Sequence, residues 1–202
     1  MKTSVIGSIL SRAAGFLLVF FLLCGLVYTL LVTGIGQALF PHQANGSVIT
    51  VDGRTYGSEL LAQPFSDQEH LWGRPMDLDV GSFTDSEGQP VLYAWASNKT
   101  PAGEELDALI QERLAALQAA DPAMAGVPVP VDLVTVSGSG LDPEISPEAA
   151  AYQVHRIAQA RGMSEAQVQA VIDAHTTGPL LGLLGEPRVN VLKVNLALDG
   201  IL

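Results

Sequence analysis

A long stretch without charge near the N-terminus constrains this chain more than any other feature. No Lys, Arg, Asp or Glu occurs from Ala13 to Val51, and residues 13–35 are almost entirely apolar. As a helix, residues 13–35 would rise roughly 34 Å, which is enough to cross a hydrocarbon core of about 30 Å. We therefore predict a single transmembrane helix over residues 13–35, surrounded by the lipid bilayer.

A cleaved signal peptide is the alternative interpretation of this stretch. Such a peptide has an apolar region of only about 7–15 residues, followed by a cleavage site with small residues. Here the apolar stretch is longer, and the best candidate site, Gly36-Gln37-Ala38, fits the pattern poorly. A retained anchor is the preferred interpretation.

The charges on the two sides of the span predict its orientation. Lys2 and Arg12 are the only charged residues before it, and positive flanks favour the cytoplasmic side. We expect residues 1–12 to form a cytoplasmic tail and residues 36–202 to form one extracytoplasmic domain, periplasmic or extracellular, on a bacterial inner membrane. The net charge of -11 argues against nucleic acid as a partner, because phosphate binding needs a basic surface.

Short apolar runs and capped helices alternate irregularly after the span. This order predicts an α+β domain with a small mixed sheet. Strands are expected at residues 48–51, 91–96, 131–136 and 192–198, the last because Leu192, Val194, Leu196 and Leu198 alternate strictly. Helices are expected after Thr100, Ser146 and Ser164, ending at Asp121-Pro122, Gly162 and Thr177-Gly178-Pro179 respectively.

No catalytic motif is visible in the sequence. The P-loop pattern and the G-x-S-x-G nucleophile elbow are both missing, and the four histidines lack metal-ligand spacing. We therefore expect neither a catalytic nor a metal site. The pair Gly138-x-Gly140 lacks the third glycine of a dinucleotide fingerprint, so we interpret residues 137–140 as a turn rather than a phosphate site.

Polar residues in loops are the candidates for contact with a partner protein. The set comprises Gln43, Asn45, Gly46 and Ser47 after the membrane exit, Arg74 in an irregular loop, and Glu186, Arg188 and Asn190 before the last predicted strand. For Glu186 and Arg188 a local salt bridge that fixes the turn is an equal alternative.

Several motifs occur together in one order along the chain. They are Phe40-Pro41, residues 43–47, Gly73-Arg74-Pro75, residues 137–143, Ile145-Ser146-Pro147, Gln153-Val154, Arg156, Ala160-Arg161-Gly162, residues 184–192 and residues 195–199. In these motifs the chain resembles the C subunit family of the Kdp potassium-transporting P-type ATPase. Glu144 departs from that pattern, since the family usually has His there.

The resemblance implies an accessory, non-catalytic subunit of a complex that imports potassium at the expense of ATP. Its implied partners are a potassium-channel-like subunit and an ATP-hydrolysing pump subunit. The Asp-Lys-Thr-Gly phosphorylation motif of such pumps is missing from this chain. The family is described as a catalytic chaperone that raises the pump's affinity for ATP. No cofactor is otherwise expected.

The nucleotide contact implied by the resemblance involves Ser137, Gly138, Ser139, Gly140, Leu141 and Asp142. This conflicts with the predicted orientation, because an extracytoplasmic domain cannot reach cytoplasmic ATP. We therefore favour assembly and stabilisation at the outer face of the complex as the physical role. The alternative is a stand-alone, membrane-anchored periplasmic binding protein or hydrolase.

Overall fold

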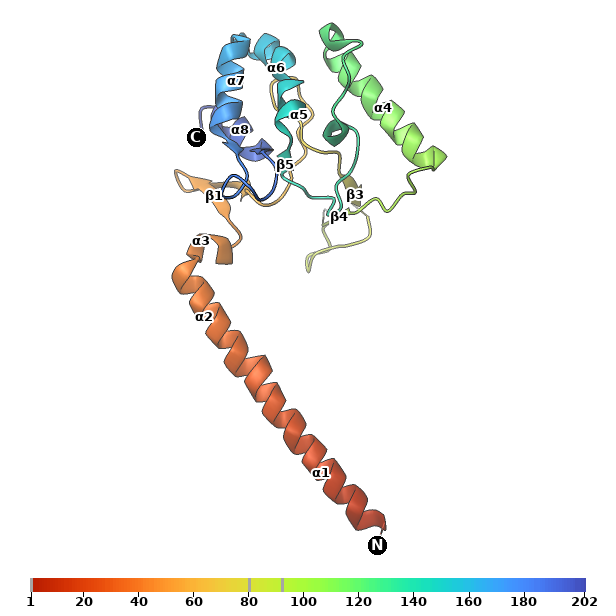
Figure 1. The fold of residues 1–202 in the computed structure, drawn as a ribbon, viewed down its shortest axis with the longest axis vertical. Helices are drawn as coiled ribbons and strands as arrows, with labels where there is room; N and C mark the ends of the chain where they lie inside the picture. Colours follow the sequence, from red (N-terminus) through yellow and green to blue (C-terminus); the bar gives the residue numbers. More distant parts are fainter. Residues whose placement is uncertain (1, 80, 92) are drawn as a thin grey trace. The chain divides into compact units, whose positions relative to one another are not determined.

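The computed structural model describes residues 2–79, 81–91 and 93–202. The chain divides into two compact units, the first ending at Val48 and the second running from Ile49 to Leu202. Figure 1 shows the order of the elements along the chain. Each unit is described by itself.

The first unit is one long helix followed by a short one. α1 (Lys2–Phe20), the π-helical η1 (Phe21–Tyr28) and α2 (Thr29–Leu39) follow one another without a break. Within them, Val5–Leu39 forms a helix long and apolar enough to cross a membrane. It is the one such helix among the described residues, which fits a single-pass membrane protein. The helix extends beyond residues 13–35 on both sides. On the C-terminal side it continues to Leu39 because the first proline, Pro41, begins only the next helix, α3 (Pro41–Ala44).

From Val48 onward, small sheets alternate with helices, so the predicted α+β class is confirmed. The strands are β1 Val48–Val51, β2 Arg54–Ser58, β3 Asp77–Asp79, β4 Tyr93–Trp95, β5 Glu144–Ile145, β6 Thr176–Thr177 and β7 Arg188–Asn190. The helices are α4 Glu104–Ala120, η2 Pro122–Met124, η3 Val131–Leu133, α5 Pro147–Ala151, α6 Val154–Arg161, α7 Glu165–Ala174 and α8 Val191–Leu198. β1 pairs with β2, β3 pairs antiparallel with β4, and β7 lies between β5 and β6, antiparallel to both.

The local capping signals predicted the starts of two helices correctly. The Ser146 hydroxyl accepts a hydrogen bond from the Ala149 N–H at 3.2 Å, with Pro147 as the first helical residue. Ser164 and Gln167 form the reciprocal capping box that begins α7. Gly162 ends α6 in the left-handed conformation, with a φ of 65°.

The strand predicted at residues 192–198 is wrong, because this segment is the helix α8. Asn190 caps it, accepting a hydrogen bond from the Lys193 N–H at 3.0 Å. The alternating apolar residues also satisfy helical spacing, since Val191, Val194 and Leu198 lie three and four residues apart. The cap and the packing decide between two periodicities that coincide here.

Four other predicted elements differ from the structure. In place of the strand expected at residues 131–136, the structure has the short 3-10 helix η3, and just after it the Thr135 hydroxyl donates to the Val131 carbonyl at 2.9 Å. The helix expected after Thr100 begins at Glu104 with Gly103 as its cap. The helix after Ser146 is interrupted between α5 and α6. Within residues 91–96, only Tyr93–Trp95 forms a strand, and Leu92 lies outside the described residues.

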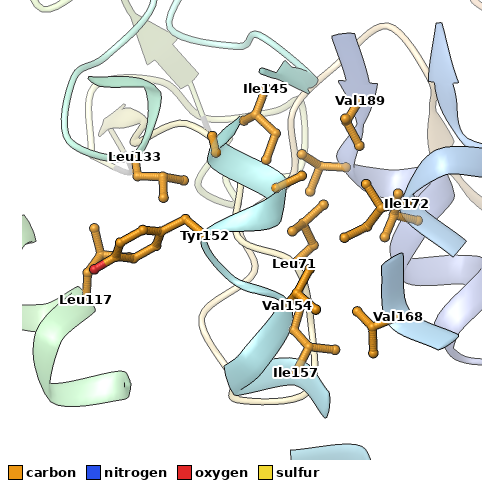
Figure 2. Close-up of a cluster of buried hydrophobic side chains, with 14 of the residues drawn as sticks. Leu71, Leu117, Leu133, Ile145, Tyr152, Val154, Ile157, Val168, Ile172 and Val189 are labelled. Atoms are coloured by element: carbon orange, nitrogen blue, oxygen red, sulfur yellow. The ribbon is translucent and has the colours of Figure 1, made fainter. Parts of the chain in front are cut away.

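The core of the second unit lies between α5, α6, α7 and the sheet formed by β5, β6 and β7. Figure 2 shows its buried side chains, with Leu71 among Val154, Ile157, Ile172 and Val189. Leu71 is fully buried, although residues 67–72 belong to neither a helix nor a strand. Its backbone therefore needs hydrogen-bond partners that secondary structure does not provide.

Two buried amide side chains supply those partners. The Leu71 N–H donates to Asn195 Oδ1 at 2.7 Å, and Asn195 Nδ2 donates back to the Leu71 carbonyl at 2.9 Å. The Trp72 N–H donates to Gln153 Oε1 at 2.8 Å, and Gln153 Nε2 donates to the Trp72 carbonyl at 3.0 Å. Each amide thus acts like a neighbouring strand and ties the segment to a helix.

We predict that Asn195→Ala strongly destabilises the folded domain. The substitution leaves the buried Leu71 N–H and carbonyl without partners, at about 1–3 kcal/mol each, so the free energy of unfolding should fall by about 2–5 kcal/mol. Gln169→Ala on α7 is the control, since its side chain bonds only to Asp173 on the same helix. The control should change the free energy by less than about 0.5 kcal/mol. Denaturant unfolding of the full chain in detergent measures both, and equal losses would contradict the assignment.

Candidate functional site

Four of the predicted site residues meet around one hollow of about 360 Å³. Its lining consists of Arg74, Asp132, Asp142, Glu144, Ile145, Ser146, Glu186, Pro187 and Arg188. We call it the acidic hollow, because four carboxylates face two arginines across it. The structure thus brings together Arg74, Asp142, Glu186 and Arg188, which are far apart in the sequence.

Arg74 is held at the edge of this hollow by internal contacts. Its Nη1 lies 3.3 Å from Asp142 Oδ2 and 4.0 Å from Asp132 Oδ1. Its Nη2 donates to the Val136 carbonyl at 3.5 Å. Asp132 in turn accepts a hydrogen bond from the Ser146 N–H at 2.9 Å, next to the start of α5. Arg74 therefore ties the loop before β3 to the chain that leads into β5.

Arg188 pairs with Glu144 instead of Glu186. The distance from Arg188 Nε to Glu144 Oε1 is 2.9 Å. The register of β5 and β7 places Glu144 opposite Asn190, so Arg188 is its diagonal neighbour on the same face. The local salt bridge that was one interpretation of the turn is therefore wrong. Both partners of the observed pair stay partly exposed, with side chains 45% and 33% accessible.

Asn190 faces the interior rather than a partner. It is buried, and its Oδ1 caps α8 while its Nδ2 donates to the Glu59 carbonyl at 2.8 Å. Its position before an apolar run is the signal that identifies it as a helix cap. Asn190 thus has a structural task, whereas Glu186 is exposed, as are the other residues of the turn up to Arg188.

The turn at residues 137–142 uses its own donors internally. The Gly140 N–H donates to the Ser137 hydroxyl at 2.9 Å, and the Leu141 N–H donates to the Ser139 hydroxyl at 3.2 Å. Asp142 accepts a hydrogen bond from the Glu144 N–H at 3.0 Å. These N–H groups are the ones that a phosphate cradle would direct outward.

Gly140 has a packing reason to be glycine, whereas Gly138 has none. The φ of Gly140 is +72°, and a Cβ at this position would lie 2.2 Å from the Trp95 carbonyl oxygen. The turn therefore packs directly against the backbone of strand β4. A Cβ at Gly138 would meet nothing within 4 Å.

The polar residues after the membrane helix belong to the first unit and form a local cap. Asn45 Nδ2 donates to the Pro41 carbonyl at 2.6 Å and to Gln37 Oε1 at 3.1 Å. Gly46 and Ser47 both have positive φ, and the Ser47 N–H donates to the His42 carbonyl at 2.9 Å. Gln43 is exposed. This segment ends the helix and turns the chain into β1.

The sequence did not predict the hydrogen-bond network around His70. Its Nδ1 lies 2.8 Å from Asp67 and its Nε2 lies 3.0 Å from Asp199, which also binds Arg161 at 2.6 Å. Arg156 donates to the His70 carbonyl at 2.9 Å. The separation of 129 residues between His70 and Asp199 hides the contact, and no local pattern marks it.

The electrostatics of this network set two unusual pKa values. Burial lowers the pKa of Arg156 to about 10, so it stays charged at neutral pH. The guanidinium is compensated by several carbonyls and by the ring of Trp72, whose centroid is 4.4 Å away. Burial also acts to lower the pKa of His70, but its hydrogen bonds with Asp199 and Asp67 outweigh this and raise it.

Comparison with known proteins places these features in a family. The KdpC family model, described as "K+-transporting ATPase, c chain", matches residues 10–200. The chain belongs to the KdpC family. It is 50% identical over 195 residues to a Potassium-transporting ATPase KdpC subunit of Clostridium botulinum (strain Eklund 17B / Type B), covering 96% of this chain and 97% of the relative.

Two further KdpC subunits show the same extent of similarity. The protein of Clostridium perfringens (strain ATCC 13124 / DSM 756 / JCM 1290 / NCIMB 6125 / NCTC 8237 / Type A) is 54% identical over 92% of this chain and 93% of its own. The protein of Sorangium cellulosum (strain So ce56) is 54% identical, and the similarity covers 88% of this chain and 90% of the relative. The KdpC match includes the membrane helix, the acidic hollow and the His70 network.

We predict that stability falls as the pH rises above 6.5. A raised pKa means that His70 contributes its full stabilisation below the unfolded value of 6.5 and loses it as the pH rises through the folded value. His175 acts in the opposite direction. Burial lowers its pKa, so its contribution to stability is lost as the pH falls below 6.5. Thermal unfolding of the full chain in detergent should show the decline, and His70→Gln should flatten it. An unchanged slope in that variant would contradict the assignment.

Proposed function

We propose that this chain is the accessory, non-catalytic subunit of a complex that uses ATP to import potassium. The observation that carries the proposal is the family match over residues 10–200, which includes both the membrane helix and the folded domain. The relatives, named as KdpC subunits of a potassium-transporting ATPase, are similar over nearly their whole length. In this proposal its partners are a channel-like subunit and an ATP-hydrolysing pump subunit.

The physical role that we propose is to hold those two subunits together. The membrane helix keeps the domain beside partners in the same bilayer, which raises their effective concentration. The acidic hollow then offers exposed carboxylates to a basic surface of a partner. Glu186 and the partly exposed pair of Arg188 and Glu144 are its most accessible groups.

We also propose that the domain lies outside the cytoplasm of a bacterial cell. Lys2 and Arg12, both positive, are the only charged residues before the apolar stretch, and this favours a cytoplasmic N-terminus. In this orientation the acidic hollow faces the side from which potassium enters.

An effect on the pump's affinity for ATP would then be transmitted through the assembly. The N–H groups of Gly140 and Leu141 are engaged within their own turn. Asp142 and three other carboxylates of the acidic hollow would repel a triphosphate. Both features favour the assembly role over direct contact between residues 137–142 and ATP.

Deleting this chain should prevent growth at trace potassium and prevent co-purification of the channel-like subunit with a tagged pump subunit. In cells that carry Glu186→Gln, less complex should be recovered at low salt, and the recovery should fall less steeply as salt is added, because one attractive charge that salt would screen has been removed. Glu112→Gln on the exposed face of α4 is the matched control. Unchanged growth after deletion, together with a purified chain that turns over a substrate alone, would instead support a stand-alone hydrolase.

The orientation has its own test. Ser86→Cys, in the exposed loop between β3 and β4, should react with a membrane-impermeant thiol reagent in intact cells. Cys24 lies within the membrane helix and should stay unlabelled. Labelling only after lysis would reverse the orientation and restore direct contact with ATP.

A further inference from the structure

The loop between β6 and β7 exposes four leucines. The exposed fractions are 65% for Leu180, 85% for Leu181, 86% for Leu183 and 61% for Leu184. β6 and β7 pair antiparallel, and an isolated bridge between Leu180 and Leu184 closes the chain further out. The leucine tip, Leu180–Leu184, is therefore the outer end of a hairpin.

Four of the five backbone N–H groups of the leucine tip, all except that of Leu181, are hydrogen-bonded within the hairpin. The Leu180 N–H donates to the Leu184 carbonyl at 2.8 Å, and the Leu184 N–H donates back at 3.0 Å. The Leu183 N–H donates to the Leu180 carbonyl at 3.2 Å, and the Gly182 N–H donates to the Pro179 carbonyl at 3.0 Å. A segment with paired N–H groups can enter an apolar medium at a much lower cost than one with free donors.

One residue of the tip is held in an unfavourable conformation. Leu181 has a φ of +55°, in the left-handed region that favours glycine or asparagine. A bulky apolar side chain at such a position, almost fully exposed, gains little from folding. Backbone strain of this kind is retained where the displayed side chain has another task.

The leucine tip itself carries no charge, and the first charged residue after it is Glu186. Residues 174–185 contain no Lys, Arg, Asp or Glu, and burial lowers the pKa of His175 at their start, so it is neutral at pH 7. Protein interfaces combine an apolar centre with polar groups that set the orientation. Leucine side chains alone, on a backbone whose N–H groups are mostly paired, instead match the apolar layer of a lipid surface.

A lipid surface is also within reach of this domain. The membrane helix ends at Leu39 and the first strand begins at Val48. The residues between them, 40–47, extend over roughly 28 Å at most, and α3 shortens this path. The connection therefore tethers the domain to the bilayer that holds its helix.

We propose that the leucine tip inserts into the interfacial layer of the bilayer as a second membrane contact that does not span it. This contact goes beyond the proposed function and does not depend on partner subunits. Its occupant is lipid, and the side chains of Leu181 and Leu183 enter deepest because they are the most exposed.

The test uses the full chain in vesicles of phosphatidylcholine and phosphatidylglycerol. Cys24→Ala removes the native thiol, and Leu183→Cys carries an environment-sensitive fluorophore. We expect blue-shifted emission and loss of intensity when a spin-labelled lipid is included. The same fluorophore on Ser86→Cys is the control and should show neither effect.

Substitution of the neighbouring leucine separates lipid contact from an artefact of the probe. Leu181→Asn suits the positive φ and should leave folding intact, but it should reduce both the blue shift and the quenching. Water-like emission of the Leu183 probe in vesicles would overturn the proposal. A shift that arises only after the channel-like or pump subunit is added would overturn it in favour of a protein contact.

Discussion

The folded domain depends on how the backbone at Leu71 and Trp72 is satisfied. This segment crosses the core without a strand beside it, and an unpaired buried peptide group costs about as much as a lost hydrogen bond. Asn195 on α8 and Gln153 before α6 each provide one donor and one acceptor. Two helices from the end of the chain are thereby fixed to a loop that lies 81 and 124 residues earlier.

The same loop explains why two arginines are placed where they are. Arg156 is 5% exposed and would be costly to bury alone, but carbonyls of residues 67, 68 and 70 accept its hydrogen bonds. Arg161 binds the Glu69 and Leu198 carbonyls, each at 2.6 Å. The family motifs that contain Gln153, Arg156 and Arg161 therefore hold the fold together. Surface contacts with partners must be sought elsewhere, at exposed residues such as Glu186.

Local signals in the sequence were sufficient where the structure is local. Ser146 and Ser164 identified helix starts, because a cap bonds to a backbone group only three residues away. The alternation at residues 192–198 predicted the wrong element, because strand and helix spacing coincide there and the Asn190 cap and the packing decide for the helix. In the same way, four residues of the acidic hollow could be named from the sequence. Their convergence, and the pairing of Arg188 with Glu144, follow from strand register that no short pattern encodes.

Charge and apolar surface divide the domain into parts with different neighbours. Beyond Arg12 the chain has 8 basic and 21 acidic residues, so most of its surface is repelled by anionic lipid headgroups. This repulsion acts within about 8 Å at physiological salt. The uncharged leucine tip escapes the repulsion. A tethered acidic domain with one neutral, apolar projection would therefore approach the bilayer in one preferred orientation.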